Sequence, residues 1–323
     1  YNGDWEHFSQ IVMHLFINPL PDFQLAKAKQ LAEVALQPDA PLQDISYCWE
    51  GLGPMALPFV TPLMTNPKQD VAYAAARAAA FLGDQSAQKV LMQMAMMHDH
   101  PFQLAAVKTL AKLPSSPEIN ELLRQLLDSD QTLVRLEAYR ALAASGDSAI
   151  ITRSIADKFL LDIVPSHGQP IVYASRSGIP RIAVIGDKLK MNLPVMFTAM
   201  ENRLSISSQA DRPLVAVFYG GSNLPKPVSF LSSPDVPELI ARLGGAGAGG
   251  SLDFTYCEVV SLLQMLGDQQ RLSAETDGRL VPVAFVLQQP PSIERAIEKA
   301  PVISEPQSEK LGSADDSGTN PGR

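Results

Sequence analysis

The chain has 323 residues, of which 46% are hydrophobic, and its formal net charge is −8 at pH 7. This apolar content excludes a wholly disordered chain, and the acidic balance excludes a general nucleic-acid binder, which would carry a basic face. The sequence has no apolar run of about 18 residues, so we expect no membrane span. The length suits about two domains.

The first part of the chain has the apolar spacing of helices. Phe8, Ile11 and Leu15 fall on one face of a predicted helix, and the run Asn18-Pro-Leu-Pro interrupts it. We predict helices throughout residues 5–36 and further helices up to about residue 64. Because the chain opens on Tyr1 inside this pattern, we expect it to be a piece of a longer protein.

One phrase then recurs three times, at Val71–Gly83, Phe102–Pro114 and Val134–Gly146. A fixed spacing of about 31 residues is typical of stacked helical repeats. The starting run Thr61-Pro-Leu-Met is similar to that of an ankyrin unit, but it occurs once and lacks the histidine. We therefore predict an N-terminal HEAT-like α-solenoid over residues 1–154.

A basic residue occupies the same position in each copy of the phrase, namely Arg77, Lys108 and Arg140. These three side chains could form a row of positive charge that grips a partner. They could instead bond polar groups of the neighbouring unit, because stacked repeats need satisfied contacts between units. We favour the second, structural interpretation.

The pattern changes after about residue 155, where β-branched residues cluster and Pro and Gly become frequent. Segments such as Ile171–Ala174, Arg181–Ile185 and Leu214–Tyr219 predict strands, and 235–243 and 256–266 predict helices. We predict a small α+β domain at residues 155–289. Residues 290–323 are rich in Pro, Ser, Glu and Gly, which predicts a disordered tail.

Five histidines are the first candidates for chemistry. His98 and His100 could form a metal pair, but zinc sites use three or four ligands and no third ligand is near. His7 and His14 lack the spacing of a paired-histidine metal motif, and His167 lies in a predicted turn without a catalytic partner. We expect none of them to bind a metal.

Three other features have ordinary interpretations that we favour. Gly245–Gly250 has the letters of a dinucleotide-binding loop, but a helix rather than a strand precedes it. Met92–Met97 could form an adaptable binding surface, although core packing fits better. Cys48 and Cys257 are predicted to be buried free thiols. We therefore predict no catalytic, cofactor-binding or metal-binding residues and no cofactor.

The order of these parts resembles a known family. The phrases that carry the likeness are Tyr1-Asn-Gly-Asp-Trp-Glu-His-Phe, Ala75-Ala-Arg-Ala-Ala-Ala-Phe-Leu-Gly, Pro170-Ile-Val-Tyr-Ala-Ser-Arg, Pro180-Arg-Ile-Ala-Val-Ile-Gly and Tyr256-Cys-Glu-Val-Val-Ser-Leu-Leu. Over about residues 1–270 the chain is similar to the C-terminal extension of the flagellar basal-body P-ring protein of planctomycete-type bacteria.

The resemblance implies a non-enzymatic structural protein of the periplasm, part of the bushing around the flagellar rod. Its partners would be its own ring-forming region, neighbouring copies in a homo-oligomer, or other basal-body proteins. It carries over no functional residues, and the export signal and ring-forming region of the family are not in this sequence.

Two other functions remain open. The first is a HEAT-repeat protein-binding scaffold unrelated to flagella, located in the cytoplasm, which would use the Arg77, Lys108 and Arg140 edge. The second is an enzyme housed in the α+β domain near His167 and the loop Arg176–Arg181. No constellation of catalytic residues assembles there from the sequence, so a non-enzymatic role is the leading hypothesis.

Overall fold

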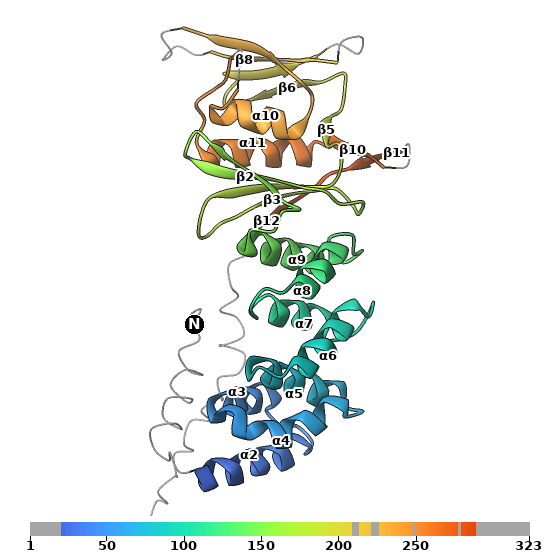
Figure 1. Ribbon diagram of the computed structural model, residues 1–323. Coiled ribbons are helices and arrows are strands. Elements are labelled where there is room, and N and C mark those ends of the chain that lie inside the picture. The colour runs from blue at the N-terminus through green and yellow to red at the C-terminus, as the bar shows by residue number, and fades with distance from the viewer. Residues whose placement is uncertain (1–20, 209–212, 221–225, 248–249, 277–278, 289–323) are drawn as a thin grey trace, which may run out of the picture. The chain divides into compact units, whose positions relative to one another are not determined.

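The computed structural model describes residues 21–208, 213–220, 226–247, 250–276 and 279–288 (Figure 1). The helix expected around Phe8 and the tail expected at residues 290–323 lie outside this range. The described residues up to Gln288 belong to one compact unit.

Helices fill the first half of the described chain. Their bounds are α2 Pro21–Ala35, α3 Leu42–Leu52, α4 Leu57–Val60, α5 Gln69–Phe81, α6 Gln85–Met96, α7 Gln103–Leu110, α8 Pro117–Leu126 and α9 Thr132–Ser145, with 3-10 turns η1 Gly53–Ala56 and η2 Thr61–Thr65 around α4. The three recurring phrases form α5, α7 and α9.

Local residues explain several of these helix ends. The side chain of Asp84 accepts a hydrogen bond from the backbone N–H of Ser86 and caps α6, and Ser116 caps α8 in the same way. Gly146 ends α9 in the left-handed conformation, with φ of 67°, which glycine adopts without strain.

Strands fill most of the second half and form three sheets. The five-stranded sheet has the order β1-β2-β4-β3-β12, the four-stranded sheet β6-β7-β8-β9, and the three-stranded sheet β11-β10-β5. The bounds are β1 Ile151–Ile155, β2 Phe159–Val164, β3 Ile171–Ala174, β4 Arg181–Ile185, β5 Lys190–Met191, β6 Met196–Ala199, β7 Leu204–Ser207, β8 Val215–Tyr219, β9 Val228–Ser232, β10 Leu272–Thr276, β11 Arg279–Pro282 and β12 Ala284–Leu287.

Two helices, α10 (Val236–Gly244) and α11 (Tyr256–Asp268), lie between the two larger sheets (Figure 1). Leu239 and Leu262 are fully buried there, in one core with Leu161 of the five-stranded sheet and Ile206 of the four-stranded sheet. The strands of the four-stranded sheet therefore alternate buried and exposed residues, as in β8, where Val217 is buried and Phe218 is exposed, whereas β3 of the five-stranded sheet is buried on both faces.

The other face of the five-stranded sheet packs on the helices. Tyr173 and Ile185 from this face share a hydrophobic core with Tyr139 and Leu142 of α9. The rings of Tyr139 and Tyr173 meet edge to face, with centroids 5.8 Å apart. The five-stranded sheet thus lies between two apolar cores, one shared with the preceding helices and one shared with α10, α11 and the four-stranded sheet.

The predicted fold class is wrong. A run of helices comes first, and a sheet-rich region with three sheets succeeds it, in place of a solenoid joined to a small α+β domain. Two physical causes stand out. Pro54, Pro58 and Pro62 interrupt helical hydrogen bonding around α4, which has only 4 residues. The five-stranded sheet also shares a hydrophobic core with α9, so the sheet-rich region is not a separate domain attached to the helices.

Candidate functional site

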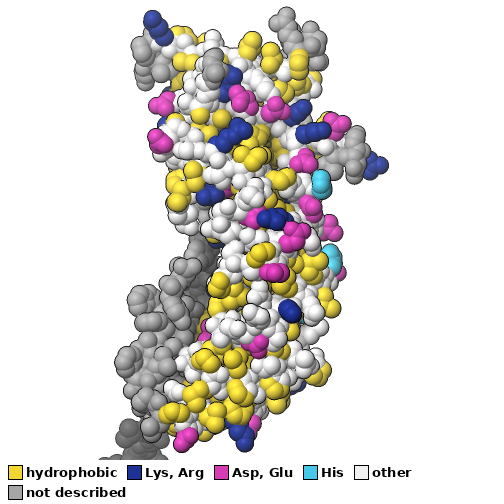
Figure 2. Space-filling model, in the orientation of Figure 1, with side chains coloured by type: hydrophobic (Ala, Val, Ile, Leu, Met, Phe, Trp, Pro, Cys, Tyr) yellow, Lys and Arg dark blue, Asp and Glu magenta, His cyan; other side chains and the backbone are white. Residues whose placement is uncertain are grey.

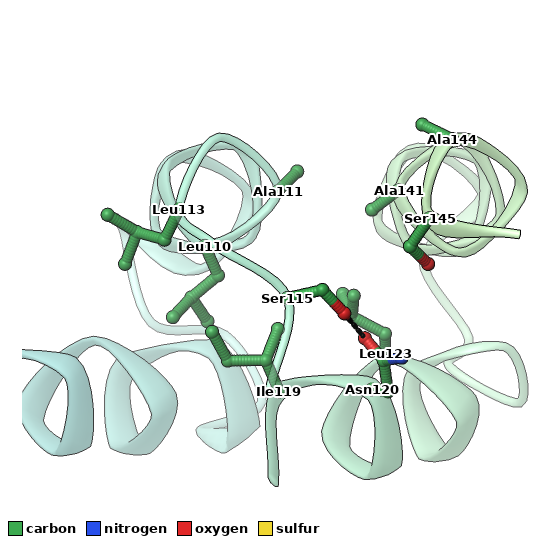
Figure 3. A pocket seen from close by; sticks show the side chains of 10 residues that line it. All are labelled: Leu110, Ala111, Leu113, Ser115, Ile119, Asn120, Leu123, Ala141, Ala144 and Ser145. Atoms are coloured by element: carbon green, nitrogen blue, oxygen red, sulfur yellow. Dashed lines mark hydrogen bonds between the residues drawn. The ribbon is translucent and has the colours of Figure 1, made fainter. Parts of the chain in front are cut away.

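A slot of about 220 Å³ lies between α7, α8 and α9 (Figure 3). Short side chains leave this space, since Ala111 follows α7 and Ala141 and Ala144 belong to α9. Ile119 and Leu123 of α8 form its floor, and the remaining lining residues are Leu110, Leu113, Ser115, Asn120 and Ser145. The lining is therefore mostly apolar, with three uncharged polar residues, and it carries no charged side chain.

The polar groups of the floor are bonded to each other. Ser115 Oγ donates to Asn120 Oδ1 over 3.0 Å, and Asn120 Nδ2 donates to Asp147 Oδ2 over 3.0 Å. Arg124 holds Asp147 with two further hydrogen bonds of 3.0 and 2.8 Å. These bonds from Arg124 lower the pKa of the Asp147 carboxyl. The slot is thus a preformed hollow with a fixed floor.

The size of this slot limits what it can bind. Pockets for small-molecule ligands usually hold about 300–1,000 Å³, with convergent polar groups that orient the ligand. A hollow of 220 Å³ with a mostly apolar, uncharged lining suits one large apolar side chain of another protein. Such side chains, seated in small pockets, are the usual anchors of protein interfaces.

A second, more open hollow of about 440 Å³ runs along α6 and α8. Met92, Met96 and Leu122 line it, with Glu118 and Glu121 at its rim. The methionine run therefore does not simply fill the core as predicted. Met94 is buried, but Met96 and Met97 are 51% and 58% exposed.

A buried polar network lies away from both hollows, in the contact between α9 and the five-stranded sheet. The carboxylate of Asp162 is fully buried and accepts hydrogen bonds from the Tyr139 hydroxyl and the Thr152 hydroxyl, each over 2.7 Å. The Arg181 guanidinium donates to the same carboxylate. Burial, together with the neighbouring Asp162 charge, raises the pKa of the Tyr139 hydroxyl well above its usual value.

Arg135 makes a second buried polar connection, one turn before Tyr139. It is 1% exposed and donates to the carbonyl of Leu127 over 2.7 Å, to Ser166 Oγ over 2.9 Å and to the carbonyl of Gln169 over 2.5 Å. These acceptors come from the end of α8 and from the loop between β2 and β3. Arg135 therefore ties two helices to the sheet.

The three basic residues singled out by the repeat differ from one another in the structure. Arg77 donates to Glu50 and Ser46 of α3 and lies over the ring of Tyr47, 4.1 Å from its centroid. Arg140 is exposed and pairs with Glu137 of its own helix over 3.0 Å. Lys108 is exposed. Only Arg77 joins neighbouring helices in the way the favoured interpretation expects.

The histidines do not come together. His98 lies 2.7 Å from Asp99, whereas the ring of His100 accepts a hydrogen bond from the backbone of Phe102. The imidazole of His167 is exposed, with its Nδ1 3.6 Å from Asp187. His7 and His14 fall outside the described residues, and within the described ranges no group of three His, Cys, Asp or Glu could hold a metal ion.

The parts of the proposed enzymatic site are also separated. His167 precedes β3, and Ile171 at the start of β3 pairs with Ile185 at the end of β4. The loop Arg176–Arg181 joins these two strands at their opposite ends. The full length of the β3–β4 hairpin therefore separates His167 from this loop.

The remaining motifs have local roles. Gly245 ends α10 with φ of 107°, and α11 begins only at Tyr256, so no helix N-terminus comes directly after the glycine run. Both cysteines are free, as predicted, but only Cys48 is partly buried and Cys257 is exposed. Burial raises the pKa of the Cys48 thiol.

The network of Tyr139, Asp162 and Arg181 and the buried Arg135 were not predicted from the sequence. One signal was present, because Arg135 and Tyr139 fall on the apolar face of a predicted helix, where polar residues need buried partners.

The surface mixes both charge signs, as the face in Figure 2 shows. Among the described residues no helix is long and apolar enough to cross a membrane.

Comparison with known proteins gives no match: no protein-family model fits the chain, and no curated protein is similar to it.

Proposed function

We propose that this chain is a non-enzymatic structural or assembly module that works by binding other proteins. The observation that carries the proposal is the slot between α7, α8 and α9. It is uncharged, preformed and of the size of one side chain, with Ala111, Ala141 and Ala144 at its walls. Its chemistry fits an apolar anchor of a protein partner better than a reacting substrate.

The distribution of reactive groups supports the same proposal. Enzymes place titratable groups beside the cavity in which the substrate lies. In the described residues the groups with buried charge, such as Arg135 and Asp162, bond to the chain's own helices and sheet. Arg135 and Asp162 hold the fold together and lie apart from the slot, and Asp147, the buried carboxylate beside the slot floor, is bonded to Arg124 and Asn120.

The resemblance to the P-ring extension gives this proposal a more specific form. In that form the module belongs to the flagellar basal body in the periplasm, and its partners are its own ring-forming region, neighbouring copies or other basal-body proteins. The alternative is a cytoplasmic protein-binding scaffold unrelated to flagella. Both forms use the slot, and they differ in the identity of the partner.

Site-specific photo-cross-linking in the cell of origin tests the proposal. A photoreactive benzoylphenylalanine replaces Ala144 at the mouth of the slot, and in a control chain it replaces the exposed Arg279 of β11. We expect a discrete cross-linked protein from position 144 that position 279 does not give. Equal labelling at both positions, or none at either, would contradict a partner in the slot.

The mass of the cross-linked species separates the two forms of the proposal. A flagellar basal-body protein supports the P-ring form, whereas a cytoplasmic protein supports the unrelated scaffold. The coding sequence upstream of Tyr1 gives an independent check. An export signal followed by a ring-forming region supports the flagellar form, and a start codon a few residues upstream contradicts it.

A further inference from the structure

The outer strand β6 of the four-stranded sheet has an open edge without charge. Within the described residues it pairs with β7 alone. The segment Leu193–Ala199 has no charged residue, and the side chain of Met196 is among the most exposed apolar ones, at 71%. Natural sheets usually protect such edges with charged side chains, bulges or covering segments.

The opposite outer strand, β9, is protected in this way. Arg242 donates from Nη1 to the backbone carbonyl of Leu231 over 3.1 Å. The backbone at Gly250 also packs against Phe230 so closely that an added Cβ would lie 2.8 Å from the Cβ of Phe230. The two edges of one sheet therefore differ, and only β9 carries such a cover among the described residues.

The hydrogen-bond register identifies the backbone groups that point out of the β6 edge. Ser208 N–H donates to the carbonyl of Val195, so Val195, Phe197 and Ala199 direct their backbone groups toward β7. In an antiparallel pair the residues between them direct theirs the other way. The N–H and C=O groups of Met196 and Thr198 thus face the open edge.

The solvent-facing positions of the paired residues in these four strands are also free of charge. Its side chains form two rows across the strands, Met196-Ser207-Ala216-Leu231 and Thr198-Ser205-Phe218-Ser229. Copies of a chain with net charge −8 repel each other. This edge and face bring two copies together without placing like charges opposite each other.

We propose that β6 is a self-association edge and that its partner is β6 of a second copy, in antiparallel orientation. Met196 lies opposite the second copy's Thr198, and each such pair exchanges two hydrogen bonds, which gives four in total. Phe197 then lies on the two-fold axis, opposite Phe197 of the second copy. Such a contact is the same patch on both subunits, as two-fold symmetry requires.

The small buried area of this strand pair limits the affinity of the dimer. A short strand pair buries less than the roughly 1,200–2,000 Å² of a stable interface. We therefore expect a reversible dimer with a dissociation constant on the order of 10–100 μM, equivalent to about 5–7 kcal/mol. The edge and the slot lie on different elements, so this inference does not depend on the proposed function.

Sedimentation equilibrium of the full chain tests the pairing with two variants at one position. Thr198→Pro removes an outward N–H that β7 does not use, and the extended backbone at Phe197 suits a residue before proline. Thr198→Val keeps the N–H and is the matched control. We expect the wild type and Thr198→Val to dimerise alike, and Thr198→Pro to dimerise at least about tenfold more weakly.

Met196→Lys provides a second test that leaves the backbone unchanged, since it places like charges near each other at the edge. It should also weaken the dimer, by up to about fivefold. A wild-type chain that stays monomeric up to about 500 μM would overturn the proposal. So would a dimer that persists in both Met196→Lys and a folded Thr198→Pro chain.

Discussion

The hydroxyl of Tyr139 donates a hydrogen bond of 2.7 Å to the buried carboxylate of Asp162, and this bond links α9 to the five-stranded sheet. Burying a carboxylate is costly unless hydrogen bonds and an opposite charge compensate it. Asp162 has both, because Thr152 and Arg181 also donate to it. The contact therefore fixes how a helix and a sheet meet within one core.

Replacing Tyr139 by Phe tests this contact. The substitution removes one donor from a buried carboxylate and leaves the apolar packing of the ring, so we expect a loss of about 1–3 kcal/mol in the free energy of unfolding. Urea denaturation measures it. Tyr173→Phe, at the neighbouring ring, leaves the Asp162 network intact and should have a smaller effect. Equal losses in the two variants would contradict a special role for Tyr139.

Arg135 should stabilise the fold through its hydrogen-bond donors rather than through the volume of its side chain. Arg135→Met keeps an unbranched apolar stem but leaves the carbonyl of Gln169 without its donor and the carbonyl of Leu127 with Ser166 Oγ in place of two donors. We expect destabilisation by at least about 2 kcal/mol. Arg140→Met, on the exposed side of the same helix, should change the free energy of unfolding by about 0.5 kcal/mol or less. Thermal unfolding of both proteins is the measurement.

Gly244 gives a case in which packing and helix propensity oppose each other. It is the last residue of α10, where alanine is favoured over glycine by up to about 1 kcal/mol. A Cβ there would come within 2.5 Å of Ile155 Cγ2 and 2.9 Å of the Phe159 ring. We therefore expect Gly244→Ala to destabilise the chain by about 1–3 kcal/mol. A stabilised variant would show that the contact with β1 and β2 is loose.

The floor of the slot should make stability depend on pH. Arg124 holds the pKa of Asp147 below its ordinary value of 3.8, so ionised Asp147 stabilises the fold above that value. This contribution is lost as the pH falls through the lowered pKa. Asp147→Asn should therefore be less stable than wild type at pH 7 and should approach it in strong acid. A constant difference from pH 7 to pH 2 in chemical denaturation would contradict this assignment.

Local patterns in the sequence predicted several elements well. The recurring phrases form α5, α7 and α9, and the segments predicted at Ile171–Ala174, Arg181–Ile185 and Leu214–Tyr219 form β3, β4 and β8. These elements alternate or repeat their apolar residues clearly. Spacing of this kind depends on neighbours in sequence, so a single chain reveals it.

The arrangement between distant segments was not predictable in the same way. β12 pairs with β3 although more than a hundred residues separate them, and this pairing completes the five-stranded sheet. β5 has only 2 residues, too few for a periodic pattern. The spacing of residues along the sequence could not show that Asp162 contacts Tyr139 either. A charged residue is identified as buried only once the groups that bond to it are known. The predicted small domain was therefore too simple.

The slot was not predictable from the sequence for the same reason, because it depends on how separate helices pack. Ala141 and Ala144 were recognisable as small residues of a helix, but alanine also packs closely against neighbouring helices. The hollow exists because Ala111 faces them across the floor formed by Ile119 and Leu123. Only the packing of three helices decides whether small residues leave a space or bring two backbones together.

The most direct test of the central claim is the yield of protein cross-linked to benzoylphenylalanine at position 144 when the slot is filled from its other wall. Ala111→Trp fills it, and Lys112→Trp, at the next and exposed position, is the control. If a partner's side chain occupies the slot, Ala111→Trp lowers the yield to the background given by a probe at Arg279, and Lys112→Trp leaves it unchanged. An undiminished yield in a folded Ala111→Trp chain would contradict the account.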